Sequence, residues 1–268
     1  MLGTIIGDIV GSPYEHSSEP MKSKDFPWFT EQCRFTDDTV TTVAVAMAIL
    51  EGKQAPGGYT EPLRRQLKYW CRKYPDVGFG SYFRAWFLRD ADEPYGSYGN
   101  GAAMRVAPAA WAARSIAEAQ ELAELTAVVT HNHPEAIKGA VAVSSALYMA
   151  RTGSDMQSIR AYIRAHFYPL REKLDEIRPS YLFTTHTAES VPQAIEAFLE
   201  SDSFEDAVNG AVSLGGDTDT QGAMAGAMAE GMYGVSAGCW ERAVRYLPQD
   251  IREAVKQFQR IYMNSILD

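Results

Sequence analysis

Apolar residues recur at helical spacing along nearly the whole chain. Five of the first ten residues follow the i, i+3, i+4, i+7, i+8 rule of one helix face, namely Leu2, Ile5, Ile6, Ile9 and Val10. A looser run of the same kind spans residues 116–126. The β-branched residues at 39–45 continue into an apolar, alanine-containing segment at 46–50, and the combined stretch is too long for a strand. No segment alternates convincingly between apolar and polar residues, so we predict an all-α fold.

Local signals for helix ends agree with this prediction. Ser115 and Glu118 have the spacing of a capping box. Ser190 and Gln193 have the same spacing, and Pro134 stands where a helix could begin. Breaks rich in Gly or Pro fall at residues 55–58, 93–101, 151–153 and 214–216. None of them resembles a long linker and there is no repeat of fixed period, so we predict a single domain over residues 1–268.

Composition is that of an ordinary globular protein. Hydrophobic residues make up 46% of the chain and charged residues 22%. No run approaches the roughly 18 apolar residues that a membrane span requires. No Lys or Arg precedes the first apolar stretch and Asp8 interrupts it, so we expect no secretory signal peptide. These features favour a cytoplasmic protein with no membrane partner, and we expect a monomer.

Charge and cysteine content exclude some classes of function. The net charge of −9 argues against nucleic acid as the main partner, because binding a phosphate backbone needs a basic stripe. A small anionic ligand stays compatible with this charge if local dipoles or metal ions receive it. Cys33, Cys71 and Cys239 are odd in number and widely spaced, so we interpret them as reduced, structural thiols.

Two clusters of Thr and Asp, about 180 residues apart, are the most informative feature of the sequence. The first, Thr36-Asp37-Asp38-Thr39, precedes a helix that we predict at residues 40–50. The second, Gly215-Gly216-Asp217-Thr218-Asp219-Thr220, precedes a predicted helix at residues 221–232. Simple N-capping would explain either cluster alone, because Asp and Thr are good N-cap residues.

Two details favour a cation site over capping. Each cluster holds more carboxylates than a cap can use. No Lys or Arg occurs between Arg178 and Arg242, although ten Asp or Glu lie in that stretch. Two carboxylates about 4 Å apart repel each other by about 4 kcal/mol at an effective dielectric near 20. A cation is therefore expected to compensate this repulsion.

The chemistry of the donor atoms indicates which cation. Carboxylate and hydroxyl oxygens without nearby Cys or His select hard ions such as Mg²⁺, Mn²⁺ or Ca²⁺. Four Asp and two Thr could hold two ions about 3.5–4 Å apart, a spacing that orients a substrate and activates water. The spacing of an EF-hand loop is missing. We predict two divalent ions, with Mg²⁺ favoured and Mn²⁺ as the alternative.

Five segments in chain order carry a resemblance to a known family: Gly7-Asp8-Ile9-Val10-Gly11-Ser12-Pro13-Tyr14-Glu15, Phe35-Thr36-Asp37-Asp38-Thr39, Gly99-Asn100-Gly101-Ala102-Ala103-Met104-Arg105, Thr130-His131-Asn132-His133 and Gly215-Gly216-Asp217-Thr218-Asp219-Thr220. They resemble the motifs of the ADP-ribosylglycohydrolases, metal-dependent enzymes that remove ADP-ribose from modified targets. The resemblance implies a compact helical domain with orthogonally packed helices. It also implies a set of metal ligands, here Thr36, Asp37, Asp38, Asp217, Asp219 and Thr220.

The resemblance gives Glu15 a catalytic role as the acid or base, beside the ligands Asp37 and Asp219. The pattern of residues supports a role independently, because Asp8, Ser12 and Glu15 at i, i+4 and i+7 would form a polar face on an apolar helix. The alternative is that Glu15 belongs to a solvated helix end, since charged residues are usually exposed.

A glycine-rich loop is the candidate for binding the substrate. Gly99, Asn100 and Gly101 precede an apolar helix predicted at residues 102–113, so they could offer free backbone N–H groups to a diphosphate. A simple turn would explain the same residues. The resemblance places this loop, with Met104, beside the diphosphate of ADP-ribose. Either Tyr95 or Tyr98 could stack on the adenine, and we take Tyr98 as the candidate.

His131 and His133 precede the helix that Pro134 opens. A capping or packing role explains both, and metal binding is disfavoured because the predicted ion site is rich in oxygen. By resemblance, one of them hydrogen-bonds the ribose or a phosphate, and His131 is the better candidate.

Together these features predict a hydrolase that cleaves the glycosidic bond between ADP-ribose and an acceptor. The ions would orient the ribose and activate water, and Glu15 would handle a proton. Two alternatives stay open: a two-metal phosphoester or nucleotide hydrolase, and a non-catalytic protein that binds ADP-ribose. All six expected ligand positions are filled, which favours catalysis.

Overall fold

The computed structural model describes residues 1–89, 92–171 and 173–263. This part of the chain forms fifteen α-helices, one 3₁₀ helix and no strand, with a single isolated antiparallel bridge between Gly99 and His186. The helices are α1 (Leu2–Gly11), α2 (Asp37–Gly52), α3 (Thr60–Lys73), α4 (Ser81–Leu88), α5 (Gly101–Met104), α6 (Ala107–Ala112), α7 (Ile116–Val128), α8 (Pro134–Arg151), α9 (Met156–His166), α10 (Leu174–Ile177), α11 (Thr187–Leu199), α12 (Phe204–Val212), α13 (Thr218–Tyr233), α14 (Ala237–Ala243), η1 (Val244–Tyr246) and α15 (Gln249–Tyr262). The predicted all-α fold is confirmed.

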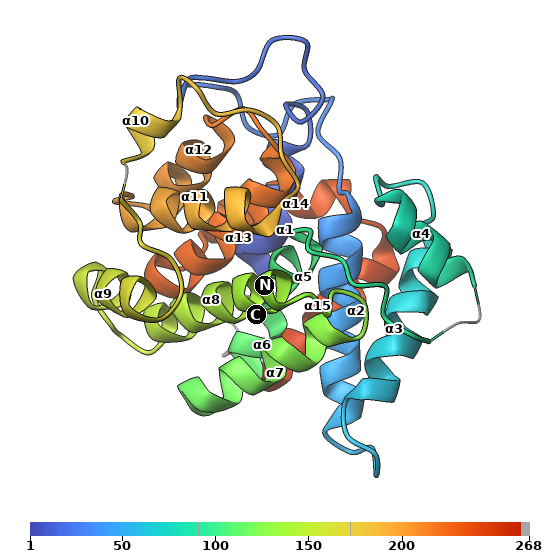
Figure 1. Cartoon of the computed structure of the whole chain (residues 1–268). Helices are drawn as coiled ribbons and strands as arrows, with labels where there is room; N and C mark the ends of the chain where they lie inside the picture. The colour runs from blue at the N-terminus through green and yellow to red at the C-terminus, as the bar shows by residue number, and fades with distance from the viewer. Residues whose placement is uncertain (90–91, 172, 264–268) are drawn as a thin grey trace.

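Helices α1 and α13 pack along each other in the middle of the molecule (Figure 1). Glycines allow their backbones to touch. A Cβ atom added at Gly3 would lie 2.0 Å from the carbonyl oxygen of Gly226, and one added at Gly7 would lie 2.0 Å from that of Gly222. Because both neighbours are backbone atoms, neither could yield to a larger side chain. The first helix and the helix behind the second acidic cluster are thereby fixed against each other.

A buried glutamate secures the start of α1. The helix has no side-chain cap from its own N-cap residue. Instead the carboxylate of Glu230, on α13, accepts hydrogen bonds from the backbone N–H groups of Leu2 at 3.1 Å and Gly3 at 3.0 Å. A carboxylate at a helix N-terminus accepts hydrogen bonds from the free N–H groups, and its negative charge interacts favourably with the positive end of the helix dipole. All ten residues of α1 are buried, including Asp8.

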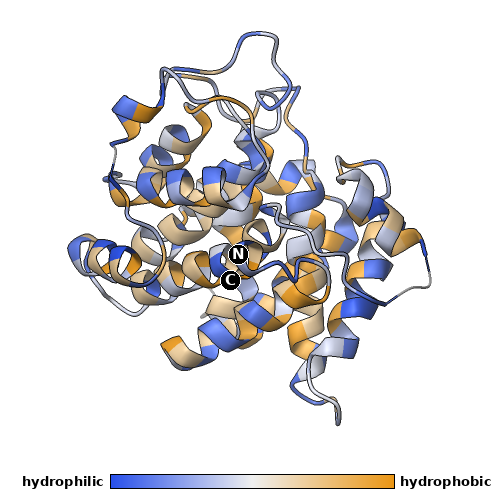
Figure 2. Cartoon of the chain, viewed as in Figure 1, coloured by the Kyte–Doolittle hydropathy of each residue, from blue (hydrophilic) through white to orange (hydrophobic). Residues whose placement is uncertain are grey.

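Hydrophobic residues dominate the helices at the centre, and outer helices such as α3 and α9 show hydrophilic residues on one side (Figure 2). In α13, every residue from 218 to 230 is buried. One large hydrophobic cluster joins residues from Met1 to Met263, and a smaller one lies around Leu174 and Leu214. No helix in the described ranges is long and apolar enough to cross a membrane.

Several predicted helix ends agree with the structure. Helix α8 begins at Pro134. Ser115 caps α7 by accepting from the N–H of Glu118, although the Glu118 carboxylate accepts from the N–H of Arg114 and not from that of Ser115. The predicted cap at Ser190 is wrong: Ser190 lies inside α11, where its hydroxyl donates to the carbonyl of His186.

The prediction of one continuous helix over residues 102–113 is wrong. The segment is divided into α5 and α6, with Arg105 and Val106 between them. Pro108 stands in the first turn of α6. Proline has no N–H to donate and its ring clashes with the carbonyl four residues earlier, so a helix tends to restart there. The division leaves Arg105 at a bend, beside the cleft described next.

Candidate active site

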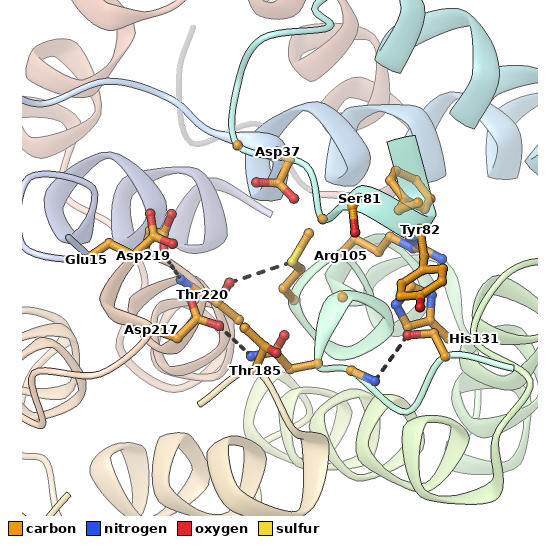
Figure 3. A pocket seen from close by; sticks show the side chains of 18 of the residues that line it. Glu15, Asp37, Ser81, Tyr82, Arg105, His131, Thr185, Asp217, Asp219 and Thr220 are labelled. Carbon is orange, nitrogen blue, oxygen red and sulfur yellow. Dashed lines mark hydrogen bonds between the residues drawn. The ribbon is translucent and has the colours of Figure 1, made fainter. Parts of the chain in front are cut away.

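A cleft of about 420 Å³ opens where the ends of several helices meet (Figure 3). Acidic side chains line one end, among them Glu15, Asp217 and Asp219. Tyr82 and His131 lie at the other end, with Arg105 beside them. Among the described residues, the cleft therefore combines a carboxylate cluster with a region of aromatic rings and one arginine.

Asp8 fixes the first acidic cluster to helix α1. Its carboxylate accepts from the backbone N–H of Thr36 at 3.0 Å and from the Thr36 hydroxyl at 2.7 Å. It also accepts from the N–H of Thr39 at 3.1 Å and from the Thr39 hydroxyl. Four donors on one buried carboxylate explain why Asp8 interrupts an apolar helix. Asp8 is not among the predicted site residues, although that interruption was the signal for it.

Asp38 joins the two clusters. Its Oδ2 atom accepts from the hydroxyl of Thr220 at 3.2 Å and from that of Thr36 at 3.4 Å. Its Oδ1 atom is buried and has no hydrogen-bond partner in the described part of the chain. Asp37, one residue earlier, lines the cleft. Helices α2 and α13 therefore begin side by side, which the sequence spacing alone could not reveal.

The second cluster is not explained by capping. Asp217 is the N-cap residue of α13, yet its side chain makes no capping hydrogen bond. Its Oδ2 atom instead accepts from the side-chain amide of Asn100 at 2.7 Å. The N–H of Thr220 donates to Asp219 at 2.9 Å. The Asp217 carboxylate is thus directed into the cleft by a residue of the predicted substrate loop.

Two groups of three carboxylates could each hold a metal ion. One consists of Asp8, Asp38 and Asp219, and the other of Glu15, Asp217 and Asp219; within each group one oxygen per residue lies within 4.8 Å of the others. Asp219 belongs to both groups. Across the described residues, no Lys or Arg forms an ion pair with any of these five side chains. The donor set therefore fits hard divalent cations.

Burial and mutual repulsion perturb these carboxylates strongly. Burial, reinforced by the charge of Asp219, raises the pKa of Asp8 to about 7 and that of Glu15 to about 8. The same two causes hold the pKa values of Asp37, Asp38 and Asp217 well above the usual range. Like charges crowded in a site of low dielectric favour protonation unless a cation neutralises them.

Glu15 lies in the turn that follows α1, not on the helix. Helix α1 ends at Gly11, so the predicted helical face of Asp8, Ser12 and Glu15 does not continue to its last member. The Glu15 carboxylate still reaches the same aspartate as Asp8 does, namely Asp219. Its side chain is 18% exposed, and the His16 imidazole lies 3.4 Å away on the solvent side. Glu15 therefore faces both the carboxylate cluster and the cleft.

The predicted substrate loop lines the cleft, but part of its backbone is already engaged. The N–H of Asn100 donates to the carbonyl of Thr185 at 2.9 Å, and the N–H of Gly99 donates to the Ser97 hydroxyl at 3.2 Å. Helix α5, which Gly101 begins, has only four residues. Gly99, Asn100, Gly101 and Met104 all line the cleft. Two of the three backbone N–H groups of this loop therefore already have partners, and the role of the loop in binding a diphosphate stays a prediction.

The aromatic candidates separate in the structure. Tyr95 lines the cleft, whereas Tyr98 is not among the lining residues. The Tyr98 ring is half exposed and meets the rings of His133 and His186 edge-on, at centroid distances of 5.8 and 4.9 Å. His131 does line the cleft, and His133 instead caps α8 through its ring nitrogen. The part of Tyr98 in binding stays a prediction.

The sequence assigns no role to several other residues that line the cleft. They include Tyr82 and Phe83 on α4, Phe183 and Thr185 from the segment before α11, and Arg105. Each comes from a loop or a short helix whose position depends on tertiary packing. For Arg105 alone there was a signal, since it ends the third motif of the resemblance.

An all-α fold with a carboxylate-lined cleft at its helix ends defines the class of this protein. The chain matches the family model "ADP-ribosylglycohydrolase" over residues 1–266, and it belongs to that family. It is 28% identical to the human ADP-ribosylhydrolase ARH3, in an alignment that covers 88% of this chain and 84% of the relative. It is 26% identical to the ADP-ribosylarginine hydrolase Tri1 of Pseudomonas putida, with 97% and 79% covered.

The solved structure of an "ADP-ribosylglycohydrolase-related protein complex" is similar in fold. It superposes with a TM-score of 0.71 and covers 98% of this chain and 96% of its own, at 22% sequence identity. The helical architecture is therefore shared over nearly the whole length of both chains.

Proposed function

We propose that the protein is a metal-dependent hydrolase that cleaves the glycosidic bond between ADP-ribose and a modified acceptor. Membership of the ADP-ribosylglycohydrolase family supports this proposal, as do the names of the relatives ARH3 and Tri1. The observation that carries it is that two sets of three carboxylates, Asp8, Asp38, Asp219 and Glu15, Asp217, Asp219, share Asp219 at the end of the cleft.

As ligands of two divalent cations we propose the predicted six, Thr36, Asp37, Asp38, Asp217, Asp219 and Thr220. Asp38, Asp217 and Asp219 belong to the two groups of clustered carboxylates, and Asp8 and Glu15 complete those groups. In the described part of the chain, Oδ1 of Asp38 has no hydrogen-bond partner and no Lys or Arg forms a direct ion pair with the clustered carboxylates, although the charge of Arg34 acts on Glu15. These observations favour bound cations. Mg²⁺ is proposed, and Mn²⁺ would suit the same oxygens. When bound, such ions supply positive charge that orients substrate oxygens and lowers the pKa of water.

Glu15 would hold or move the proton of the reaction. A catalytic acid or base works best when its pKa lies near the working pH. In the metal-free protein, burial and the charge of Asp219 raise the pKa of Glu15 to about 8, and a cation bound at Asp219 would lower it from that value. The carboxyl group is partly open to the cleft, so a water molecule or a leaving group could reach it. As the bond to the acceptor breaks, positive charge develops on the ribose, and the surrounding carboxylates would stabilise that charge electrostatically.

The other end of the cleft would bind the nucleotide part. His131 presents a polar group there, and Tyr82 and Tyr95 present rings, stacked on each other with centroids 6.4 Å apart. A region of rings with a few directed polar groups is typical of a small-molecule site. We propose that the adenine and the phosphates lie at this end and the scissile bond lies beside Glu15.

The product distinguishes this function from phosphoester hydrolysis at the same oxygens. Peptides with ADP-ribosylated arginine or serine would be incubated with the protein and Mg²⁺, and the products identified by mass spectrometry. Free ADP-ribose with an unmodified peptide is the expected result, and chelation by EDTA should abolish it. Release of AMP with a phosphoribosylated peptide would instead show hydrolysis of the diphosphate bond, the reaction of a nucleotide hydrolase. Binding of ADP-ribose without turnover of any acceptor would favour a non-catalytic protein.

A further inference from the structure

Arg105 is a buried cation that forms no direct ion pair with a described carboxylate, although the charge of Asp37 acts on it. Only 1% of its surface is exposed, and it is the largest of the fully buried side chains in the described part of the chain. Its guanidinium carbon lies 5.4 Å from the centre of the Phe83 ring. Burying a charge without a counterion is costly. The fold therefore keeps this cation beside the cleft at the expense of stability.

The guanidinium directs the hydrogen bonding of Thr130. Its Nη2 atom donates to the Thr130 hydroxyl oxygen at 2.7 Å and to the carbonyl of Thr126 at 3.3 Å. Arginine has donors only, so the hydroxyl must accept in this contact. The hydroxyl oxygen also lies 2.8 Å from Nδ1 of His131. Thr130 is fully buried, and its single hydroxyl hydrogen is available for that nitrogen.

The tautomer of His131 follows from this chain of contacts. If Nδ1 accepts from Thr130, the ring proton of a neutral imidazole must reside on Nε2. The other groups around the ring do not reverse this assignment: Tyr95 meets it edge-on at 5.8 Å, Phe83 lies 6.4 Å away, and Arg105 is the nearby charge. Burial and the charge of Arg105 lower the pKa of His131 well below its usual value.

The position of Nε2 puts its hydrogen at the cleft. A Cβ atom added at Gly101 would lie 2.9 Å from Nε2, so the ring occupies the space that a side chain at Gly101 would take. Both Gly101 and His131 line the cleft, and the backbone N–H of His131 is fixed by the Ala127 carbonyl at 2.8 Å. The imidazole is held at its backbone and at Nδ1, while Nε2 has no hydrogen-bond partner among the described residues.

We infer that Arg105 and Thr130 are positioning residues, which hold His131 as a neutral imidazole whose Nε2–H donates to an oxygen of the bound ligand. The ligand atom must be an acceptor, such as a phosphate or ribose oxygen. Nε2 in this state serves neither as a metal ligand nor as a base. The identity of the ligand as ADP-ribose rests on the proposed function, but the state of the imidazole does not.

Nitrogen NMR of ligand-free protein with ¹⁵N-labelled histidine tests the state of the ring directly. His131→Gln identifies the signals of His131 among those of the five histidines. Between pH 5.5 and 8 we expect an unprotonated Nδ1 and a protonated Nε2 that do not titrate. In Thr130→Val the tautomers should mix, and Thr130→Ser should restore the wild-type spectrum. A wild-type ring with its proton on Nδ1, or one that becomes charged near pH 6.5, would overturn the inference.

Calorimetry with ADP-ribose separates this inference from the proposed function. Thr130→Val should weaken binding roughly three- to tenfold, as expected when one neutral hydrogen bond is impaired, and Thr130→Ser should bind like the wild type. Unchanged affinity in Thr130→Val together with a mixed tautomer would refute the donor role of His131. If the wild type shows the expected NMR spectrum but binds no ADP-ribose, the positioning stands and the proposed function fails.

Discussion

Without divalent cations, raising the pH from 5 to 8 is expected to destabilise the folded protein through Glu15 and its neighbours. Burial and the charge of Asp219 raise the pKa of Glu15 from 4.5 to about 8 in the folded state. The folded protein therefore binds more protons than the unfolded chain between these two pH values. The free energy of unfolding decreases with rising pH wherever the folded state binds more protons than the unfolded state. The loss of stability therefore develops as the pH rises through this window.

The magnitude follows from the size of this change in pKa. A rise from 4.5 to about 8 corresponds to about 5 kcal/mol between the charged and neutral forms, of which about 4 kcal/mol is lost between pH 5 and pH 8. For proteins of this size one kcal/mol moves the melting temperature by about 2–4 °C, so Glu15 alone should account for about 10 °C. Carboxylates near the surface whose pKa is lowered, such as the half-buried Glu118 and the exposed Asp175, act in a more acidic range and do not offset this loss.

The assay is thermal unfolding, followed by circular dichroism in EDTA at a series of pH values. The wild type should melt at lower temperature at pH 8 than at pH 5, and Glu15→Gln should show a clearly flatter dependence. Glu19→Gln, at an exposed position close in sequence, is the matched control and should follow the wild type. At pH 8, Mg²⁺ at about 100 times its dissociation constant should restore about 2.7 kcal/mol. A melting temperature independent of pH, or the same slope in Glu15→Gln as in the wild type, would refute this reasoning.

Three further predictions concern catalysis, packing and ligand binding. Glu15→Gln should lower kcat by roughly 10²–10⁴ while ADP-ribose still binds, and normal kcat with an unchanged pH profile would remove Glu15 from the mechanism. Gly7→Ala should destabilise the fold by at least about 1–3 kcal/mol in chemical denaturation, because its Cβ would overlap the backbone of α13. The same change at Gly238, a helical site with open space around it, should be neutral or stabilise by up to about 1 kcal/mol. ADP-ribose should raise the melting temperature far more than ribose does, and equal shifts would count against a phosphate-binding region in the cleft.

The sequence predicted the helical fold and the ends of several helices because those features are encoded locally. Pro134 and Ser115 act within one turn of their own helices, so their spacing is visible in the chain. Ser190 has the same local pattern but lies inside α11, because the helix already begins at Thr187, after the N-cap residue His186. Local patterns therefore predicted the presence of a helix more reliably than the residue at which it begins.

The carboxylates of the site were predictable, but their arrangement was not. Excess Asp in the two clusters indicated a cation site without any knowledge of the fold. The contact of Asp38 with Thr220 depends on the packing of α1 against both α2 and α13, which places the N-termini of α2 and α13 together. The role of Asp8 depends on the contact of α1 with the start of α2, because its four donors come from Thr36 and Thr39, about thirty residues away.

The far end of the cleft was least accessible to sequence reasoning. Arg105, Thr130 and His131 meet because a bend after α5 and the end of α7 approach each other in space. A buried arginine without a carboxylate partner has no distinctive local pattern. The division of the predicted helix at Pro108 was readable in principle, since a proline inside a helical pattern favours a new helix start within the turn that precedes it.

The central claim is that the carboxylate groups sharing Asp219 hold the divalent cations on which activity depends. Isothermal titration of Mg²⁺ and Mn²⁺ into metal-free wild type and Asp219→Ala tests it most directly. Asp202→Ala, at a surface position outside the cleft, is the control, and circular dichroism checks that each variant is folded. We expect wild type and Asp202→Ala to bind the ions and Asp219→Ala to lose this binding together with hydrolysis, because both ligand groups lose their shared member. Undiminished binding of both ions by folded Asp219→Ala would contradict the account.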